Sequence, residues 1–324
     1  MAFGADKIGQ SSFQTQKISK GVRGTAMGDA YVALATDVSS VYWNPAGLVK
    51  IPRGQGQLLI SRINMPADIS YHTIAYGRNL GFGSIGVNVD FLKTDEMEII
   101  TVDGKTGETF TASEMTIGIS FAQAIIDNFS YGFTFKYLRN DFADEDQSAF
   151  SADLGVRYRT DFRGLTLGIA VKNIGPDTRF DGTYTDQTKA QAGGQPAENT
   201  EYGEAPQPST FQFALAATAS EMFGMNLEGQ DIAFSVQLES PSDRPERVAF
   251  GAEYNFQELL FLRGGFKFNA GEEGFTLGLG VNHQVGKLGY AFDYAYLQFG
   301  DFHTADNNDG LLSQPHRFSL KLAF

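Results

Sequence analysis

The sequence predicts an all-β protein, a 14-stranded antiparallel transmembrane β-barrel with an N-terminal plug in its lumen. Three observations predict this class: side chains alternate with a period of two from residue 55 onward, the connections are long on one side and short on the other, and the chain ends on an aromatic residue. The final run, 313–324, is apolar on one face and charged or polar on the other. A strand between lipid and a water-filled lumen requires this pattern.

Composition narrows the class further. The chain has 324 residues and no cysteine. No apolar run approaches the ~20 residues that a membrane helix needs. Membrane strands escape such a scan because every second residue is polar. The formal net charge of −13 argues against a nucleic-acid partner.

Residues 1–50 differ from the rest of the chain. Four apolar side chains recur there at helical spacing and predict a short amphipathic helix over 25–36. These side chains are Met27, Ala30, Tyr31 and Leu34. A second short helix is expected after Asn44, because Asn suits an N-cap and Pro45 suits the first helical position. Such short helices need something to pack against.

The rest of the chain reads as strands. We expect fourteen, at 55–64, 69–80, 82–93, 112–125, 128–140, 148–160, 164–174, 209–219, 231–240, 245–256, 259–269, 273–285, 287–299 and 313–324. We therefore divide the chain into an N-terminal plug with short helices, 1–50, and a transmembrane barrel, 51–324.

The connections agree with this count. Those after odd-numbered strands are long and include 94–111, 141–147, 175–208 and 300–312. Those after even-numbered strands are short, as outer-membrane barrels have them on the periplasmic side. The exception is 220–230, where either the strand count slips or the turn carries a small element.

The size of the barrel predicts where the first fifty residues go. Fourteen strands at ~4.8 Å spacing and ~40° tilt enclose a backbone radius of roughly 14 Å. Side chains alone cannot fill that bore, so we expect 1–50 to plug it. Charges of both signs should face inward and form paired networks that hold the plug, not an open selective pore. They are Lys136, Asp153, Arg157, Arg247, Glu253, Arg263, Lys267, Asp293, Arg317 and Lys321.

The first fifty residues also carry a family resemblance. It rests on Gly21-Val22-Arg23-Gly24-Thr25-Ala26-Met27-Gly28-Asp29-Ala30-Tyr31-Val32-Ala33 and on Tyr42-Trp43-Asn44-Pro45-Ala46-Gly47-Leu48. These runs resemble the N-terminal signature of PorV/PorQ-like outer-membrane proteins of the FadL superfamily, and Asn44-Pro45-Ala46 is similar to the hatch box of FadL-type proteins. The resemblance implies a hatch whose motif residues are Arg23, Met27, Gly28, Trp43, Asn44, Pro45, Ala46 and Gly47.

The resemblance implies two alternative functions. A PorV-like barrel would bind or help export a protein partner, using outer loops such as 175–208, in a role like type IX secretion. A FadL-like barrel would pass fatty acids or similar hydrophobic molecules, and would need an apolar pocket and a lateral gap, which the glycine-rich strand 82–93 could open. Five side chains either line such a pocket or form the plug core. They are Met27, Tyr31, Leu34, Tyr42 and Trp43.

Nothing in the sequence indicates catalysis, a cofactor or a transition-metal site. The four histidines are scattered, and no Ser/His/Asp set can be singled out, so we do not expect an enzyme. The acidic loop of Asp141, Asp144, Glu145 and Asp146 either binds calcium or is simply solvated.

The predicted location is the outer membrane of a bacterial cell, with many strands crossing it and lipid as one partner. Export to that membrane requires a secretory signal, and none precedes Ala2. We therefore expect the sequence to be the mature form.

Overall fold

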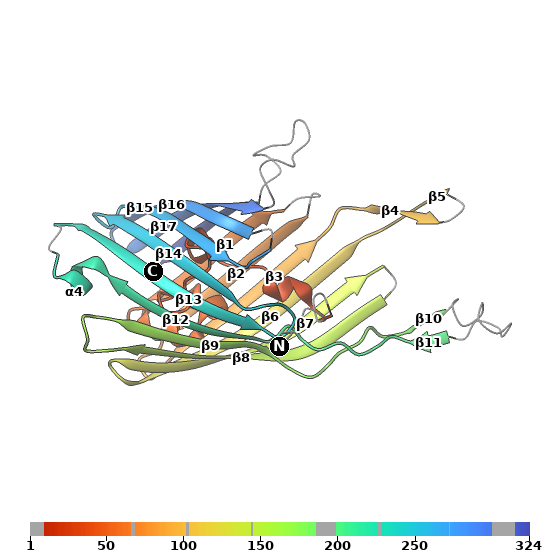
Figure 1. Ribbon diagram of the computed structural model, residues 1–324, viewed down its shortest axis with the longest axis horizontal. Coiled ribbons are helices and arrows are strands. Elements are labelled where there is room, and N and C mark those ends of the chain that lie inside the picture. The colour runs from red at the N-terminus through yellow and green to blue at the C-terminus, as the bar shows by residue number, and fades with distance from the viewer. Residues whose placement is uncertain are drawn as a thin grey trace.

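The structure is a closed β-barrel of fourteen antiparallel strands (Figure 1). The computed structural model describes residues 10–65, 69–101, 104–143, 145–185, 199–225, 228–271, 273–299 and 315–324. The barrel strands are β1 (Gly56–Asn64), β2 (Ser70–Asn79), β3 (Ser84–Lys93), β6 (Ala112–Ile126), β7 (Phe129–Phe142), β8 (Glu145–Arg159), β9 (Thr166–Ile174), β12 (Thr210–Thr218), β13 (Gln230–Pro241), β14 (Arg247–Phe256), β15 (Leu260–Phe268), β16 (Glu273–Val285), β17 (Leu288–Phe299) and β18 (His316–Ala323). Sequential neighbours pair, and β18 pairs with β1 to close the barrel.

The alternation in the sequence becomes an outside and an inside. On β7, Phe133 and Phe135 are 45% and 53% exposed, whereas Thr134 and Lys136 between them are 1% and 5% exposed. The exposed side chains meet lipid, because a barrel of this kind presents its apolar register outward. The predicted fold class is therefore confirmed, and each of the fourteen predicted strands corresponds to one barrel strand.

Two connections differ from the expected loops. The predicted loop 141–147 is a tight hairpin, because β7 and β8 pair as far as Phe142 and Glu145. Arg139 helps by pairing with Asp141, at 2.8 Å, and with Asp146, at 3.5 Å, so the acidic residues of the hairpin do not simply repel one another. The long even connection contains the helix α4 (Ala219–Phe223), so the strand count holds there.

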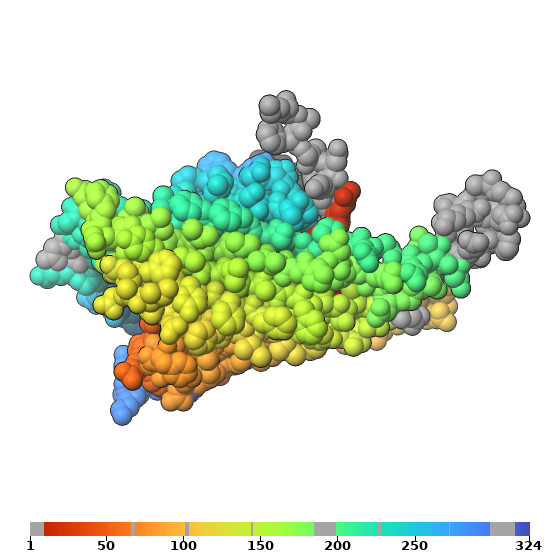
Figure 2. All heavy atoms as spheres, turned by 90° about the horizontal axis from the view of Figure 1, so that it is seen from below, coloured from red at the N-terminus to blue at the C-terminus, as the bar shows by residue number. Residues whose placement is uncertain are grey.

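Two hairpins continue beyond the barrel at the end opposite α4 (Figures 1 and 2). One consists of β4 (Met97–Thr101) and β5 (Gly104–Phe110), and the other of β10 (Thr183–Thr185) and β11 (Asn199–Glu201). The sequence predicted both stretches as loops. We call this end of the barrel the hairpin end and the opposite end, which carries α4, the turn end.

Residues 10–55, which we call the N-terminal segment, run through the barrel. They form η2 (Gln14–Lys17), α1 (Val22–Ala26), α2 (Ser40–Trp43) and η3 (Pro45–Lys50). The predicted helix over 25–36 is wrong: α1 ends at Ala26, because Gly28 and Asp29 both take positive φ angles, of 65°, and turn the chain. Within the described residues, no helix combines the length and apolarity that a transmembrane helix requires.

A lateral gap at 82–93, which the FadL-like alternative could use, is not formed in the paired part of this strand. β3 pairs with β2 and with β6 from Ser84 to Lys93 without a shift of register. Its glycines do not kink the strand, because Gly86 faces inward against the N-terminal segment, where an added Cβ would lie 2.7 Å from Val41.

Candidate functional site

The strongest link between the N-terminal segment and the barrel wall is a buried network of charged groups. Arg23 donates two hydrogen bonds to Glu253 on β14, from Nε at 2.8 Å and from Nη2 at 2.6 Å. Glu253 also accepts from Arg263 on β15 at 2.5 Å, and Arg263 donates to Asp293 on β17 at 2.6 Å. Bidentate arginine–carboxylate pairs are strong and directional, so this network fixes α1 against the part of the wall that runs from β14 to β17.

A second anchor lies on the same side of the lumen. Lys267 on β15 pairs with Asp29 of the N-terminal segment and, at 2.5 Å, with Glu273 on β16. Arg317 on β18 donates to the backbone carbonyl of Ser19. A lysine and an arginine of the wall thus hold the chain on both sides of α1.

The third anchor is the pair between Lys321 on β18 and Asp37, at 2.6 Å. Asp37 also accepts hydrogen bonds from the backbone N–H and the hydroxyl of Ser39, at 2.9 and 2.5 Å. Burial by itself would raise the pKa of Asp37, but Lys321 and Arg23 outweigh it and hold the pKa well below its usual range. Asp37 is therefore ionised in the folded protein at neutral pH.

Three more of the predicted inward charges, Lys136, Asp153 and Arg247, pair within the wall itself, Arg247 with a carboxylate that was not predicted. Lys136 on β7 lies 2.6 Å from Asp153 on β8. Arg247 on β14 lies 2.7 Å from Glu239 on β13. These pairs remove net charge from the lumen but do not contact the N-terminal segment.

Arg157 is the remaining predicted inward charge. Its Nε donates to the backbone carbonyl of Ala33 at 3.2 Å, so it binds the N-terminal segment through a carbonyl. The structure thus places all ten predicted charges inside the barrel. It brings Glu253, Arg263 and Asp293 into one network, whereas the others form separate ion pairs or, for Arg157 and Arg317, bind backbone carbonyls of the N-terminal segment.

Sequence reasoning missed further charged pairs that join the N-terminal segment to the wall. Lys20 pairs with Asp90 on β3 at 3.1 Å, and Lys17 pairs with Asp243 at 2.6 Å. The inward register of β3 could have identified Asp90, since it alternates with exposed Val87, Val89 and Phe91. The lysines carried no such signal, because short irregular helices do not define a facing side.

The hatch-motif asparagine joins three parts of the chain. Asn44 is fully buried, and its Oδ1 accepts from the backbone N–H of Ala46 at 3.2 Å, which caps η3. Its Nδ2 donates to the carbonyls of Val32 and of Val156 on β8, each at 3.0 Å. Pro45 occupies the first position of η3, as the sequence predicted.

The wall meets the N-terminal segment at inward-facing glycines. An added Cβ on Gly155 would lie 2.1 Å from Asn44 Oδ1, and one on Gly265 would lie 2.2 Å from the backbone N of Gly28. Five more wall glycines would place an added Cβ within 2.8 Å of the N-terminal segment. They are Gly86, Gly132, Gly168, Gly251 and Gly278. The segment thus lies backbone to backbone against the wall, as close packing around glycine permits.

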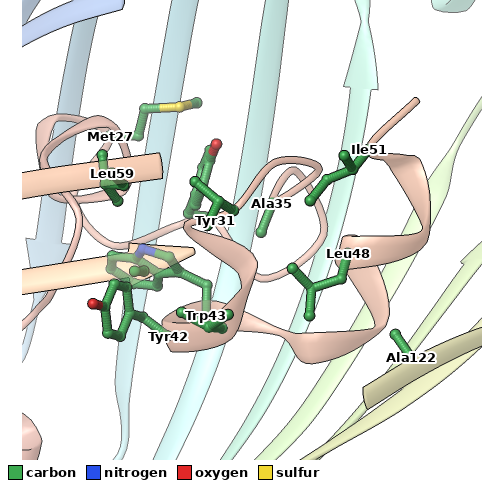
Figure 3. Packing of buried hydrophobic residues seen from close by; sticks show 12 residues of the cluster. Met27, Tyr31, Ala35, Tyr42, Trp43, Leu48, Ile51, Leu59 and Ala122 are labelled. Carbon is green, nitrogen blue, oxygen red and sulfur yellow. The ribbon is translucent and has the colours of Figure 1, made fainter. Parts of the chain in front are cut away.

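The five candidate pocket residues lie together as packed core. Met27, Tyr31, Tyr42 and Trp43 are at most 6% exposed and form one cluster, against which Leu34 packs (Figure 3). The rings of Tyr31 and Trp43 meet edge to face with centroids 5.7 Å apart. These side chains fill the space that an apolar ligand would need.

Two small cavities lie in the described lumen beside this core. One has a volume of about 30 Å³ and is lined by Lys172, Trp43, Gln212 and other mostly polar residues. Another has about 20 Å³ and lies beside Lys136 and Asn173. Cavities of this size hold a water molecule or two, and buried atoms such as Trp43 Nε1 and Gln212 Oε1 lack a protein partner there.

Larger hollows lie at the ends and on the outside of the barrel. A cup of about 460 Å³ opens at the hairpin end, and a polar hollow of about 420 Å³ lies at the turn end near Lys321. An apolar groove of about 560 Å³ crosses β12 to β15 on the wall. No group of three or more potential metal ligands occurs in the described residues, and Asp144 of the acidic loop lies outside them.

Comparison with known proteins gives one family match. The model of the family described as type IX secretion system protein PorV matches residues 10–192, which include the N-terminal segment and β1 to β9. A search of curated proteins finds no match.

Several solved barrels have a similar fold. The crystal structure of the Ralstonia pickettii toluene transporter TbuX aligns with a TM-score of 0.58 and 13% identity, over 96% of this chain and 98% of that one. The P. putida toluene transporter TodX aligns with a TM-score of 0.58 and 11% identity, over 94% of this chain and 97% of that one. A Pseudomonas aeruginosa FadL homologue aligns with a TM-score of 0.57 and 12% identity, over 94% of this chain and 98% of that one. At such identities the likeness concerns the fold alone.

Proposed function

Because this chain belongs to the family of type IX secretion system protein PorV, we propose that it is an outer-membrane barrel that binds a protein partner during export. In this proposal residues 1–50 are a hatch that stays in place, and 51–324 are the barrel that carries it in a bacterial outer membrane. Lipid surrounds the wall, the hairpin end faces outward, and the barrel is not an enzyme.

The observation that carries the proposal is the anchoring of the N-terminal segment inside the lumen. Three anchors, centred on Arg23, Asp29 and Asp37, tie the N-terminal segment to the wall. Removing one partner of a buried ion pair costs about 3–5 kcal/mol, so opening a path along the lumen would be expensive. The lumen cavities are polar and of water size, which suits a scaffold better than a conduit for apolar molecules.

The hairpin end supplies the surface for a partner. The two chain segments that lead into the second projecting hairpin are bridged at Thr178 and Ala205, whose backbone groups exchange hydrogen bonds of 2.9 and 2.8 Å. Its aromatic rings gather on one side, with centroids of Phe180 and Tyr202 5.9 Å apart and of Tyr184 and Tyr202 5.3 Å apart. Tyr184 is exposed and the other two rings are half-buried, and aromatic side chains that remain accessible in this way are suited to protein contacts.

The alternative is a FadL-like transporter of hydrophobic small molecules, which the fold similarity favours. Extraction of the protein in mild detergent, followed by mass spectrometry for lipids and proteins, separates the two. We expect an exported protein at near-stoichiometric amount. Fatty acid bound in its place, with no protein, would reject partner binding and support transport.

A pair of shortened variants sharpens the test. Replacement of 179–204 by a short Gly-Ser linker should lower partner recovery, because it removes the aromatic side chains of the hairpin. The bridge between Thr178 and Ala205 is retained and keeps the two ends of the linker together. Replacement of 98–109, which removes most of the other hairpin, is the matched control and should retain the partner. Equal recovery from both variants would contradict the assignment to the second hairpin.

A further inference from the structure

One seam of the barrel wall is incompletely hydrogen bonded. On one side β8 pairs with β7 over its whole length, from Glu145 to Tyr158. On the other side its ladder with β9 stops at Ala152, which opposes Ile174. Residues 145–151 therefore form a free edge of seven residues at the hairpin end, about 23 Å long at 3.3 Å per residue.

A bulge causes the ladder to stop. The register between β8 and β9 shifts at Asp153, where Lys172 and Asn173 together oppose one residue. Asn173 has a φ of 58°, and Asp153 accepts its backbone N–H at 2.7 Å while holding Lys136 at 2.6 Å. A bulge held by a buried ion pair turns the following chain away from β8, so the edge is a built feature.

The chain after β9 covers this edge only loosely. Residues 175–181, which we call the strap, make a single backbone hydrogen bond to the edge among the described residues, from Asp181 N–H to Asp146 O at 2.8 Å. Elsewhere side chains span the seam: Gln207 donates to Phe150 O at 2.8 Å, and Gln147 donates to Thr178 Oγ1 at 2.7 Å. A few side-chain amides thus make hydrogen bonds at positions where the backbone groups of another strand could pair with β8.

The surroundings specify what could add to the edge. Along 145–151 the inward side chains Gln147, Ala149 and Ser151 are buried, whereas Phe150 is 56% exposed on the outside. An added strand would continue this division, polar inward and apolar outward. The cup of about 460 Å³ lies beside the edge and includes Gln147 and Thr178 in its lining, so it can accept inward side chains.

The charged residues around the free edge restrict the kind of segment that could bind there. The described residues of 139–146, 175–182 and 199–207 carry seven carboxylates and two arginines. Arg139 and Arg179 are both already paired, with Asp141 and Glu201. The rim of the seam therefore has an excess of negative charge, which favours a partner with lysine or arginine.

We propose that the partner docks by strand addition: an extended segment of the exported protein, with basic and apolar side chains alternating, pairs with the free edge of β8 at 145–151 and displaces the strap. The proposal rests on the proposed function and names the recognised segment. Backbone hydrogen bonds would supply the affinity and the alternate side chains the selectivity, as in other cases of strand addition.

The direct test uses a synthetic probe. A fluorescent ten-residue peptide of alternating lysine and valine is titrated onto the protein in lipid nanodiscs at 0.15 M salt, and binding is followed by anisotropy. We expect binding, and at least tenfold weaker binding of the same peptide N-methylated at every second residue, which keeps the charge but removes backbone donors. Equal affinity of the two peptides would overturn strand addition, leaving charge attraction only.

A reversible clamp locates the site. The chain has no cysteine, so Asp146→Cys with Asp181→Cys introduces the one possible disulfide, and the backbone hydrogen bond between these residues brings their Cα atoms within disulfide range. The oxidised form should bind the peptide at least tenfold more weakly than the reduced form of the same sample. Equal binding by both forms would overturn the site.

Two further measurements separate this inference from the proposed function. The double variant Ser120→Cys with Thr134→Cys is the control, because it links β6 to β7, which are already paired. Its oxidised and reduced forms should bind the peptide equally. Gln207→Ala frees Phe150 O and should strengthen peptide binding severalfold. If the wild type recovers an exported partner and the oxidised Asp146/Asp181 clamp recovers it equally, the docking site fails while the function stands. If no partner is recovered from the wild type, the function fails.

Discussion

Single residues in the lumen act through partners that are far away in the sequence. Asp37 holds Lys321 across the seam where β18 closes on β1, and Asn44 holds a backbone carbonyl of β8. Because these groups are buried, the loss of one partner leaves the other without a substitute, and the cost exceeds that of a surface contact.

Asp37→Asn should destabilise the protein by about 2 kcal/mol at pH 7, because the amide keeps an acceptor for Ser39 but loses the charge opposite Lys321. This cost is below that of a fully buried pair, since the Lys321 side chain is 21% exposed. The folded-state pKa of Asp37 is lowered, so its contribution is complete above its unfolded pKa of about 4 and is lost as the pH falls through the folded value. Urea unfolding in lipid vesicles from pH 7 to pH 3 should therefore show the wild type approaching the variant. Asp127→Asn, on an exposed turn, is the control; a pH-independent difference would count against the ion pair.

Asn44→Ala should cost about 2–4 kcal/mol, since it removes the η3 cap and leaves two buried carbonyls without their donor. Urea unfolding measures the loss, and single-channel recording in planar bilayers tests whether the hatch loosens. Asn64→Ala, at an exposed strand end, should be near neutral. Wild-type stability together with a closed channel in the Asn44 variant would show that the cap is dispensable.

At the scale of elements, the structure depends on how closely irregular segments approach regular ones. Glycine pairs on adjacent strands, such as Gly132 with Gly155 and Gly251 with Gly265, form flat places in the wall where the N-terminal segment lies. The same wall cannot admit a side chain at these places without moving the segment.

Gly155→Ala should therefore destabilise the seated hatch by roughly 1–3 kcal/mol or displace it, because the new Cβ would lie 2.1 Å from Asn44 Oδ1. Gly264→Ala is the matched control, since its nearest neighbour would lie at an ordinary 3.8 Å on another barrel strand. Unfolding midpoints and channel conductance of the two variants give the comparison. Equal behaviour of both would mean that the hatch does not seat on the wall glycines.

For the molecule as a whole, the closed wall separates lipid from an interior that the N-terminal segment occupies. The outward register carries the large apolar side chains, and the inward register carries charges that pair with the N-terminal segment or with one another. A wall of this kind is stable only with lipid or detergent against its outer face.

Phe133→Arg tests the lipid-facing register, because Phe133 lies in the middle of β7 and packs against Phe121 with centroids 5.7 Å apart. We expect a loss of about 2–4 kcal/mol in vesicles, whereas Phe162→Arg on a turn at the barrel end should cost about 0–1 kcal/mol. Urea titration of both variants measures the difference. A purified wild type that stayed monodisperse without detergent would remove the membrane assignment altogether.

The sequence by itself determined the class, the number of strands and which residues face inward. These properties follow from a local rule, since lipid on one side and polar surroundings on the other require a change of polarity at every second residue. The same rule identified ten inward charges, and the runs around Arg23 and Asn44 indicated the family that the match to 10–192 then supported.

Only the tertiary structure decided which charged side chains pair with one another. Arg23 and Glu253 are separated by 230 residues, and no local pattern links them. It also decided that the chain turns at Gly28, where the apolar spacing predicted a continued helix. Gly28 lies so close to β15 that an added Cβ would be 2.8 Å from the backbone N of Phe266. The free edge of β8 is likewise a tertiary property, since it depends on a buried ion pair between neighbouring strands that holds a bulge at Asn173.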